Sequence, residues 1–339
     1  MTKQDISSIK QLLSTKKKIV IVPHKNPDGD AIGSTLGLYH FLLKTSHDVQ
    51  VIVPNDYPTF LKWMPGENTI LKHDTNTKNC NQLIDNADII FTLDFNAFHR
   101  TGNMETVLTN SKALKIMIDH HQEPDDYAAY TFSDVTMSST CEMIYHFIDM
   151  LGETNCIDKD IATNLYVGIM TDTGSFRFRS TTSTTHRIIA ELIDKGADNN
   201  EIHNNVYDTN SYNRLQLLGC ALSNLKVIPE SRTAYITLSQ NELNKFDYKK
   251  GDTEAVVNYA LSLNNIIFAA IFIEDRQEGI IKISLRSKGE FSVNAFSRAH
   301  FNGGGHNNAA GGRSELSLNK TIENFISILP SYNKALNND

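Results

Sequence analysis

The chain has 339 residues, of which 40% are hydrophobic and 21% charged, a balance typical of folded globular proteins and not of disordered or fibrous ones. Its length predicts two domains, at about 100–200 residues each. A net charge of −7 disfavours a broad basic surface that would grip long duplex nucleic acid. The longest apolar run, residues 266–273, is far shorter than the ~20 residues that a membrane span needs, so we expect no membrane partner.

The N-terminal segment and the cysteines indicate the compartment. The first 18 residues contain no apolar core and no small-residue cleavage site, so we expect no export signal. The four cysteines are scattered and form no C-x-x-C pair, which disfavours a zinc site and a disulfide framework. These features together predict a cytoplasmic protein.

Strand-like and helix-like segments alternate through the first half of the chain. The β-branched run Lys18–Val22 ends in a polar loop, and an apolar periodic stretch that indicates a helix follows. Further strand-like segments lie at 49–53, 89–93 and 115–118, and helical patterns lie at 80–87, 140–151, 159–170, 184–195 and 212–225. This alternation predicts an α/β domain with a parallel sheet and helices on both faces.

The character of the chain changes from residue 233 onward. Strand-like segments at 234–238, 266–273 and 280–285 predict a smaller α+β domain with a mixed sheet. No proline-rich or glycine-rich linker marks the boundary. We therefore predict a first domain over residues 1–205, a helical connector over 206–230 and a second domain over 231–339.

The loop after the first strand, His-Lys-Asn-Pro-Asp-Gly-Asp, contains His24, Asp28 and Asp30. It would place these side chains at the carboxyl edge of the sheet, where such folds bind ligands. Gly29 would permit a tight bend between the two carboxylates, which repel each other unless a cation lies beside them. A polar turn held by an Asx hydrogen bond explains the same spacing.

Three more acidic clusters follow predicted elements of the first domain. Asp94 ends one strand, the run Asp119, His120 and His121 ends another, and Asp172 follows an apolar helix. A lone aspartate in such a position is also typical of a helix cap or a turn. Because parallel strands end at one edge of a sheet, we expect these clusters to meet there.

The combined clusters offer enough carboxylates and imidazoles for two divalent cations that share a carboxylate. Oxygen-rich ligation with few imidazoles favours Mn²⁺, with Mg²⁺, Fe²⁺ or Co²⁺ as alternatives, whereas zinc prefers thiolate or more imidazole. Two such cations, roughly 3.5–4 Å apart, can clamp the attacking and leaving oxygens of a phosphoryl transfer. The predicted reaction is hydrolysis of a phosphate ester by a hydroxide that two metals activate.

A glycine-dense segment lies in the second domain. Its residues Gly304, Gly305 and His306 predict a turn that opens towards a helix, with backbone N–H groups that can surround an anion. Arg286, at the end of a predicted strand, and Arg100, which follows Asp94 by six residues, can each add a bidentate phosphate contact. A plain glycine-rich turn and solvated arginines are the alternatives.

The four motifs of the first domain, in their order along the chain, resemble those of the DHH phosphoesterase family. The segments Ser-Leu-Arg-Ser-Lys-Gly and Gly-Gly-Gly-His resemble its DHHA-type C-terminal domain. The two-domain arrangement is similar to the NrnA-like subgroup, bifunctional oligoribonucleases that cleave very short RNA and dephosphorylate 3′-phosphoadenosine 5′-phosphate (pAp). Related pyrophosphatases and exopolyphosphatases lack the Gly-Gly-Gly-His turn, so inorganic substrates are less expected.

The resemblance leaves two alternative functions. Some close relatives hydrolyse cyclic di-AMP or its linear product pApA. An alternative of another class is a nucleotide-binding protein that keeps the fold without catalysis. The expected partners in the main reading are short RNA or dinucleotides and pAp. Relatives also suggest a homodimer through the first domain, which the apolar helix 159–170 could support, although a buried helix has the same pattern.

The resemblance implies a role for each site residue. One Mn²⁺ would bind His24, Asp28 and Asp94, and the second would bind Asp30, Asp94, His120 and Asp172. Asp119 would orient the neighbouring imidazole, and His121 would act beside the scissile phosphate as an acid or a charge stabiliser. The terminal phosphate or ribose would be held across an interdomain cleft by Arg286, Gly304, Gly305 and His306. Phe95, Phe98 and Phe176 lie near the motifs and could stack a base, but each is more typical of a core.

Overall fold

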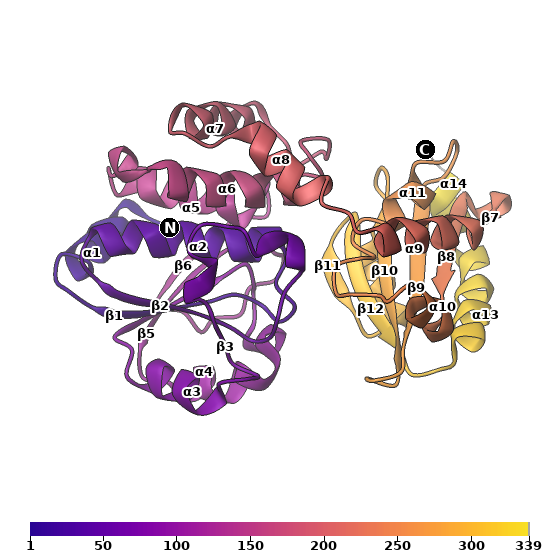
Figure 1. The fold of residues 1–339 in the computed structure, drawn as a ribbon, viewed down its shortest axis with the longest axis horizontal. Coiled ribbons are helices and arrows are strands. Elements are labelled where there is room, and N and C mark those ends of the chain that lie inside the picture. Colours follow the sequence, from indigo (N-terminus) through magenta and orange to yellow (C-terminus); the bar gives the residue numbers. More distant parts are fainter. Residues whose placement is uncertain (338–339) are drawn as a thin grey trace. The chain divides into compact units, whose positions relative to one another are not determined.

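The computed structural model describes residues 1–337, which fall into two compact units divided between Thr209 and Asn210 (Figure 1). Helix α9 (Tyr212–Ser223) lies within the stretch 206–230 for which a connector was predicted, and it buries Leu217 and Ala221 in a core of the second unit. No helix of the described residues is long and apolar enough to cross a membrane.

The first unit contains the predicted parallel sheet, with six strands in the order β3-β2-β1-β4-β5-β6. Every pairing in this sheet is parallel. The strands are β1 (Lys18–Val22), β2 (Asp48–Val53), β3 (Leu71–Lys72), β4 (Ile89–Leu93), β5 (Leu114–Asp119) and β6 (Tyr130–Ser133). The strand order reverses direction between β1 and β4, and ligands of such sheets bind outside the carboxyl ends of strands at that point.

Helices cover both faces of this sheet, as predicted (Figure 1). One face carries α2 (Gly29–Lys44), with α5 (Thr140–Met150) and α6 (Lys159–Asp172) packed beside it, and the other carries α3 (Thr77–Asp85) and α4 (Glu105–Asn110). The unit also contains α1 (Lys3–Leu12), α7 (Ser183–Asp194) and α8 (Asn199–Tyr207). Residues 161–170 of α6 are all buried, which agrees with the buried-helix interpretation of its apolar pattern.

Three glycines of α2 allow α6 to pack unusually close. A Cβ added at Gly29 would lie 2.3 Å from Oγ1 of Thr171, and one at Gly33 would lie 2.5 Å from the backbone oxygen of Asn164. Gly37 meets Leu165 in the same way. The expectation that Gly29 forms a bend between two carboxylates is therefore wrong: it is the first residue of α2, and its small size matters for helix packing.

The second unit contains the predicted mixed sheet, with the strand order β11-β12-β10-β9-β8-β7. Its strands are β7 (Lys226–Ile228), β8 (Thr233–Leu238), β9 (Phe268–Asp275), β10 (Ile280–Ser287), β11 (Gly304–His306) and β12 (Ala309–Ser314). Only the pair β8 and β9 is parallel among the strand pairs of the described part of this unit.

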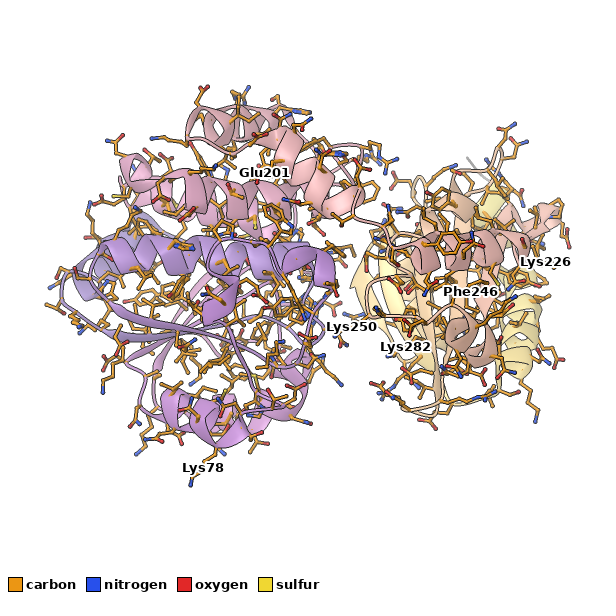
Figure 2. The ribbon with its side chains drawn as sticks, in the orientation of Figure 1. Lys78, Glu201, Lys226, Phe246, Lys250 and Lys282 are labelled. Carbon is orange, nitrogen blue, oxygen red and sulfur yellow. The ribbon has the colours of Figure 1, made fainter. Side chains whose placement is uncertain are left out.

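Helices of the second unit enclose two apolar clusters. The helices besides α9 are α10 (Gln240–Lys245), α11 (Val257–Leu261), α12 (Val293–His300), α13 (Leu318–Ile328) and α14 (Asn333–Asn337). One cluster is rich in aromatic residues such as Phe268 and Phe325, and the other is mostly aliphatic. Phe246, which follows α10, packs against the aliphatic cluster (Figure 2).

The glycine-dense segment departs from its prediction. It forms the antiparallel hairpin of β11 and β12, in which Gly305 pairs with Ala310, and no helix begins there. A Cβ at Gly305, whose φ is +145°, would lie 2.5 Å from the oxygen of Ala309. The glycines therefore let two strands approach, and the predicted turn that opens towards a helix is wrong.

Candidate metal centre

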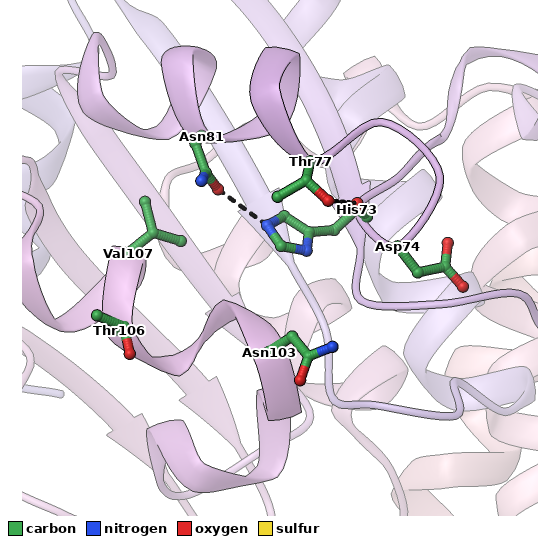
Figure 3. A pocket seen from close by; sticks show the side chains of 7 residues that line it. All are labelled: His73, Asp74, Thr77, Asn81, Asn103, Thr106 and Val107. Atoms are coloured by element: carbon green, nitrogen blue, oxygen red, sulfur yellow. Dashed lines mark hydrogen bonds between the residues drawn. The ribbon is translucent and has the colours of Figure 1, made fainter.

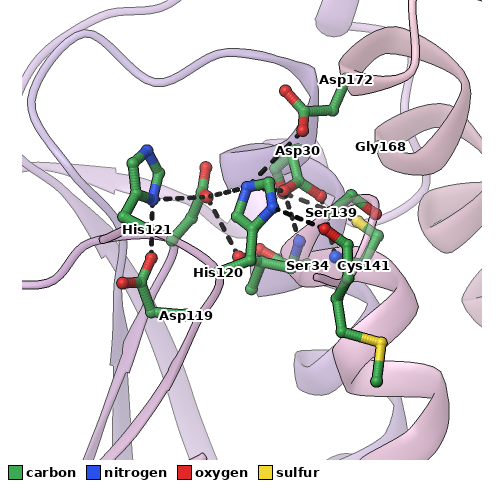
Figure 4. Close-up of polar contacts among 12 residues, drawn as sticks. Asp30, Ser34, Asp119, His120, His121, Ser139, Cys141, Gly168 and Asp172 are labelled. Atoms are coloured by element: carbon green, nitrogen blue, oxygen red, sulfur yellow. Dashed lines mark hydrogen bonds and ion pairs between the residues drawn. The ribbon is translucent and has the colours of Figure 1, made fainter. Parts of the chain in front are cut away.

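The carboxyl ends of β1, β4 and β5 and the ends of α5 and α6 meet at one edge of the first sheet (Figure 4). This edge brings together all of the acidic and histidine residues that were predicted as metal ligands. Their ligand atoms form two groups in which all atoms lie within 4.8 Å of one another. The first group is His24, Asp28 and Asp94, and the second is Asp30, His120 and Asp172.

Asp28 caps helix α2 and is also a member of the first group. Its Oδ1 accepts hydrogen bonds from the backbone N–H groups of Asp30 (3.1 Å) and Ala31 (3.0 Å), which starts α2. Its Oδ2 lies 3.9 Å from Nε2 of His24. Because the cap uses one oxygen, the Asx-type interaction and the metal-ligand role are compatible.

Asp94 lies at the centre of the cluster. Its backbone has a φ of +63°, an uncommon conformation for a residue with a side chain, which cores keep only where the surroundings enforce it. Its Oδ2 lies 3.3 Å from Nε2 of His24, and its Oδ1 lies 3.5 Å from Nε2 of His120. The two oxygens therefore face the two groups, as expected of a bridging carboxylate.

His120 connects the remaining members. Its Nε2 lies 3.7 Å from Oδ2 of Asp30 and 3.5 Å from Oδ2 of Asp172, the last residue of α6 (Figure 4). The opposite ring nitrogen, Nδ1, contacts the backbone oxygen of Met137 at 3.3 Å. A backbone partner of this kind directs the other nitrogen of the ring towards the carboxylates.

Asp119 and His121 form a separate pair beside Asp94. The His121 Nδ1 lies 2.7 Å from Oδ1 of Asp119, whose side chain is fully buried (Figure 4). Burial, together with the charge of Asp94, raises the pKa of Asp119 to about 7. Asp119 therefore holds the imidazole that follows it by two positions, and His121 is only 7% exposed.

The electrostatics of the cluster fit a site that cations neutralise. Burial, and then the charges of Asp94 and Asp172, raise the pKa of Asp30 well above its usual value. Burial would also raise the pKa of Asp94, but hydrogen bonds with His120 and His24 hold it well below the usual range. Packed carboxylates of this kind are costly without positive charge, and divalent cations can replace the protons that otherwise supply it.

The donor atoms also decide which ions suit the centre. They are carboxylate oxygens and imidazole nitrogens, which suit Mn²⁺, Mg²⁺, Fe²⁺ or Co²⁺. The nearby Cys141 is not a comparable donor, because burial and the charge of Asp30 raise the pKa of its thiol well above the usual value. The residues present therefore fit a pair of divalent cations.

The sequence did not reveal that the first turn of α5 contacts the metal-ligand cluster. Ser139 caps this helix by accepting a hydrogen bond from the N–H of Glu142 at 3.0 Å, and Thr140 and Cys141 contact Asp30. The spacing of Ser139 and Glu142 is that of a capping box, which is a signal for a helix start. Nothing in that spacing indicates which carboxylate the helix would meet.

Arg100 lies in a 3₁₀ segment (Phe98–Met104), and its backbone oxygen accepts a hydrogen bond at 2.8 Å from the N–H of Lys25, the residue after His24. In the second unit, Arg286 pairs with Ala309 on β12, and Ala309 pairs with His306 on β11. Directly paired residues of adjacent strands point to the same face of a sheet. Arg286 and His306 therefore share one face and are separated by a small residue.

Of the three phenylalanines near the motifs, Phe95 is a core residue, as predicted, whereas Phe98 and Phe176 are partly buried and pack against core clusters. Phe95 is fully buried, and Phe98 stacks on Tyr127 with a centroid distance of 4.0 Å. Phe176 packs edge-on against Tyr166 at 5.9 Å.

A pocket of about 330 Å³ lies apart from the metal-ligand cluster (Figure 3). Its lining residues are His73, Asp74, Thr77, Asn81, Asn103, Thr106 and Val107. The Nε2 of His73 contacts Oδ1 of Asn81 at 2.8 Å. None of these residues belongs to the cluster, so the pocket does not account for the chemistry that the cluster predicts.

Comparison with known proteins agrees with this architecture. Residues 18–169 match the model of the DHH family, N-terminal domain, and residues 232–335 match the DHHA1 domain. The chain is 28% identical to the bifunctional oligoribonuclease and PAP phosphatase NrnA of Thermus thermophilus, over 93% of this chain and 90% of that protein. It is 26% identical to the cyclic-di-AMP phosphodiesterase GdpP of Bacillus subtilis, over 96% of this chain but 49% of that protein.

A solved structure extends the comparison to three dimensions. The crystal structure of an exopolyphosphatase-related protein from Bacteroides fragilis superposes with a TM-score of 0.94 at 44% identity. The match covers 99% of this chain and 98% of that one. The two matched domains and this full-length likeness agree with the order of motifs in the sequence. The chain therefore belongs to the DHH family, with a DHHA1 domain following its N-terminal DHH domain.

Proposed function

We propose that this protein is a Mn²⁺-dependent phosphoesterase that hydrolyses short oligoribonucleotides and pAp. The observation that carries the proposal is the position of Asp94, whose two carboxylate oxygens face His24 on one side and His120 on the other at 3.3 and 3.5 Å. A carboxylate shared by two ligand groups would hold two cations close together, as the two-metal mechanism of phosphate-ester hydrolysis needs. The similarity to the Thermus thermophilus protein, a bifunctional oligoribonuclease and PAP phosphatase, supports the choice of substrates.

The proposed ligand sets are those that the motifs suggested. His24, Asp28 and Asp94 would hold one cation, and Asp30, Asp94, His120 and Asp172 would hold the other. When bound, the two cations polarise the phosphate and lower the pKa of water so that it can attack phosphorus. The protein's own part is to keep these carboxylates together at a buried sheet edge, where solvent screens charges less than at the surface.

His121 is the proposed proton donor or charge stabiliser at the scissile phosphate. Its Nδ1 is engaged by Asp119 at 2.7 Å, so proton exchange with a substrate falls to Nε2. The contact with Asp119 fixes the orientation of the ring. Arg100, whose backbone oxygen accepts a hydrogen bond from the N–H of Lys25 beside His24, is proposed to contact a phosphate oxygen.

The second unit is proposed to bind the end of the substrate. Arg286 and His306 share one sheet face, so together they offer a guanidinium and an imidazole to a terminal phosphate. Gly304 and Gly305 contribute a strand without side chains beside them. A net charge of −7 offers no broad basic field, which agrees with a preference for short substrates.

The test is a substrate panel with purified protein at fixed Mn²⁺ concentration. We expect hydrolysis of a labelled RNA dimer and of pAp, with little cleavage of long RNA. If metal binds and neither small substrate turns over, the substrate assignment is wrong. The Asp94→Ala variant should lose metal and activity together, whereas unchanged activity would contradict the bridging role.

A second candidate substrate follows from the likeness to GdpP over 96% of this chain. Cyclic di-AMP and pApA therefore belong in the same panel, and faster cleavage of cyclic di-AMP would favour this alternative. Inorganic polyphosphate is included because of the likeness to an exopolyphosphatase-related protein. Metal binding without turnover of any substrate would instead favour a nucleotide-binding protein.

A further inference from the structure

The first turn of α5 binds a carboxylate of the metal centre. The backbone N–H groups of Thr140 and Cys141 donate to Oδ2 and Oδ1 of Asp30 at 2.6 and 2.8 Å. The first turn of a helix leaves such N–H groups without helical partners, and these N–H groups attract negative charge. Asp30, which precedes Thr140 by 110 residues, therefore occupies the position that an anion would take at this helix end.

The side chain of the same threonine reaches the other ligand group. Its Oγ1 donates to Oδ1 of Asp94 at 3.0 Å, and Thr140 is completely buried. Thr140 thus contacts Asp30 through its backbone and Asp94 through its hydroxyl. One residue holds a carboxylate from each of the two ligand groups.

The hydroxyl of Thr140 helps to orient the Asp94 carboxylate, together with the imidazoles of His24 and His120. The last torsion of an aspartate side chain has a broad energy minimum, so neighbours must fix it. With Oδ1 bound to Thr140 and near His120, Oδ2 is the oxygen that faces His24. Rotation of this carboxylate would withdraw an oxygen from one of the two groups.

The turn that carries Thr140 is itself fixed. The buried Glu142 accepts hydrogen bonds from the Ser138 N–H at 3.2 Å and from the Thr185 hydroxyl at 3.1 Å. These contacts tie the start of α5 to α7. The donors at the metal centre therefore sit on a rigid support.

We infer that Thr140 is a positioning residue that fixes the bridging orientation of Asp94 and its spacing from Asp30, and so sets the affinity of the centre for its second cation. The inference rests on the proposed function, because it takes the two groups to be metal ligands. A merely structural role would be different: loss of a buried hydroxyl would lower stability without changing how two cations bind.

The test compares three variants by Mn²⁺ titration without substrate. Thr140→Val removes the hydroxyl at nearly constant shape, and Thr140→Ser restores it. The control is Thr35→Val, because Thr35 is equally buried in α2 but its hydroxyl donates only to the backbone oxygen of Ile32 at 3.0 Å. Calorimetry gives the stoichiometry and affinity, and electron paramagnetic resonance reports whether two Mn²⁺ ions are spin-coupled.

We expect Thr140→Val to bind the second Mn²⁺ about 10–100-fold more weakly, the range known for residues that support metal ligands, and to lose the coupled spectrum. Thr140→Ser and Thr35→Val should resemble the wild type. Wild-type affinity and a coupled spectrum in Thr140→Val would overturn the inference, as would an equal loss in Thr35→Val. If Thr140→Val does not fold, Thr140→Ala is compared with Thr140→Ser under the same criteria.

The proposed function can fail separately in this experiment. If the wild type binds no pair of Mn²⁺ ions, the two-metal centre is refuted, and the inference about Thr140 is refuted with it. If the wild type binds two Mn²⁺ ions and Thr140→Val binds them as Thr35→Val does, the two-metal centre is supported and the positioning role of Thr140 is refuted.

Discussion

The close packing of α2 against α6 can be tested with a single methyl group. Gly33 lies in the middle of α2, one turn after Asp30, and faces α6. A Cβ there would lie 2.5 Å from the backbone oxygen of Asn164 and 2.9 Å from Sγ of Cys141. Real Cβ atoms essentially never come closer than 3.0 Å to such atoms. Because a backbone oxygen cannot rotate away, Gly33→Ala must push α2 and α6 apart.

The size of the effect follows from two opposed contributions. Alanine in place of glycine inside a helix normally stabilises a protein by about 0.5–1 kcal/mol, because glycine loses more backbone freedom on folding. Forcing an extra group into a packed core typically costs about 1–3 kcal/mol. We expect the clash with backbone to dominate, with a net loss of about 1–2 kcal/mol. For a unit of this size, each kcal/mol lowers the melting temperature by about 2–4 °C.

The assay is thermal unfolding of the full chain, monitored by calorimetry. The matched control is Gly219→Ala in α9, because Gly219 is also inside a helix and a Cβ there would meet nothing within 4 Å. We expect this control to keep or raise the stability of the second unit. If Gly33→Ala is as stable as the wild type, α2 and α6 can separate at little cost, and the argument from close packing is refuted.

Four further outcomes are expected. Mn²⁺ at 100 times its dissociation constant should stabilise chelator-treated protein by about 2.7 kcal/mol in thermal unfolding, and Asp94→Asn should abolish most of this gain. Asp119→Asn should keep Mn²⁺ binding but lower turnover by about 10–100-fold, because the orientation of His121 is lost; unchanged turnover would contradict that role. Arg286→Ala should raise KM for a 5′-phosphorylated dimer more than it lowers kcat, whereas an unchanged KM would exclude the phosphate contact. Burial alone would raise the pKa of Glu242, but hydrogen bonds from Asn224 (2.8 Å) and Ser239 lower it. The contribution of Glu242 to the stability of the second unit is therefore present above the ordinary carboxyl pKa and is lost as the pH falls below about 4.5. The second unit should melt at a lower temperature at pH 3 than at pH 6, and this difference should be smaller in Glu242→Gln.

The strands of the first sheet could be predicted because their signals are local. The runs Lys18–Val22 and Ile89–Leu93 are short, β-branched and bounded by polar residues, and the structure gives them the predicted bounds. The edge strands β3 and β6 were missed. The first has two residues, and the second has the sequence Tyr-Thr-Phe-Ser with little burial, so neither carries a clear hydrophobic pattern.

The meeting of the candidate ligands could be predicted from topology alone. His24, Asp94 and His120 each follow a strand of one parallel sheet, and the carboxyl ends of such strands share an edge. The prediction for the glycine-dense segment was wrong because its structure depends on the pairing of β11 with β12. Glycine permits both an open anion-binding turn and a tight strand pair, and the choice depends on β12, which lies across from it.

Two features that were hidden in the sequence address the same physical problem. Several carboxylates must be held close together before any cation neutralises them, and their repulsion opposes folding. Backbone N–H groups of α5 offset part of that cost at Asp30, and the hydroxyl of Thr140 does so at Asp94. The glycines of α2 let α6 come close enough to place Asp172 beside His120. Because the fold itself supplies these donors, we expect the metal-free protein to keep its structure and to bind cations in an arranged site, unlike small domains that fold only with their metal.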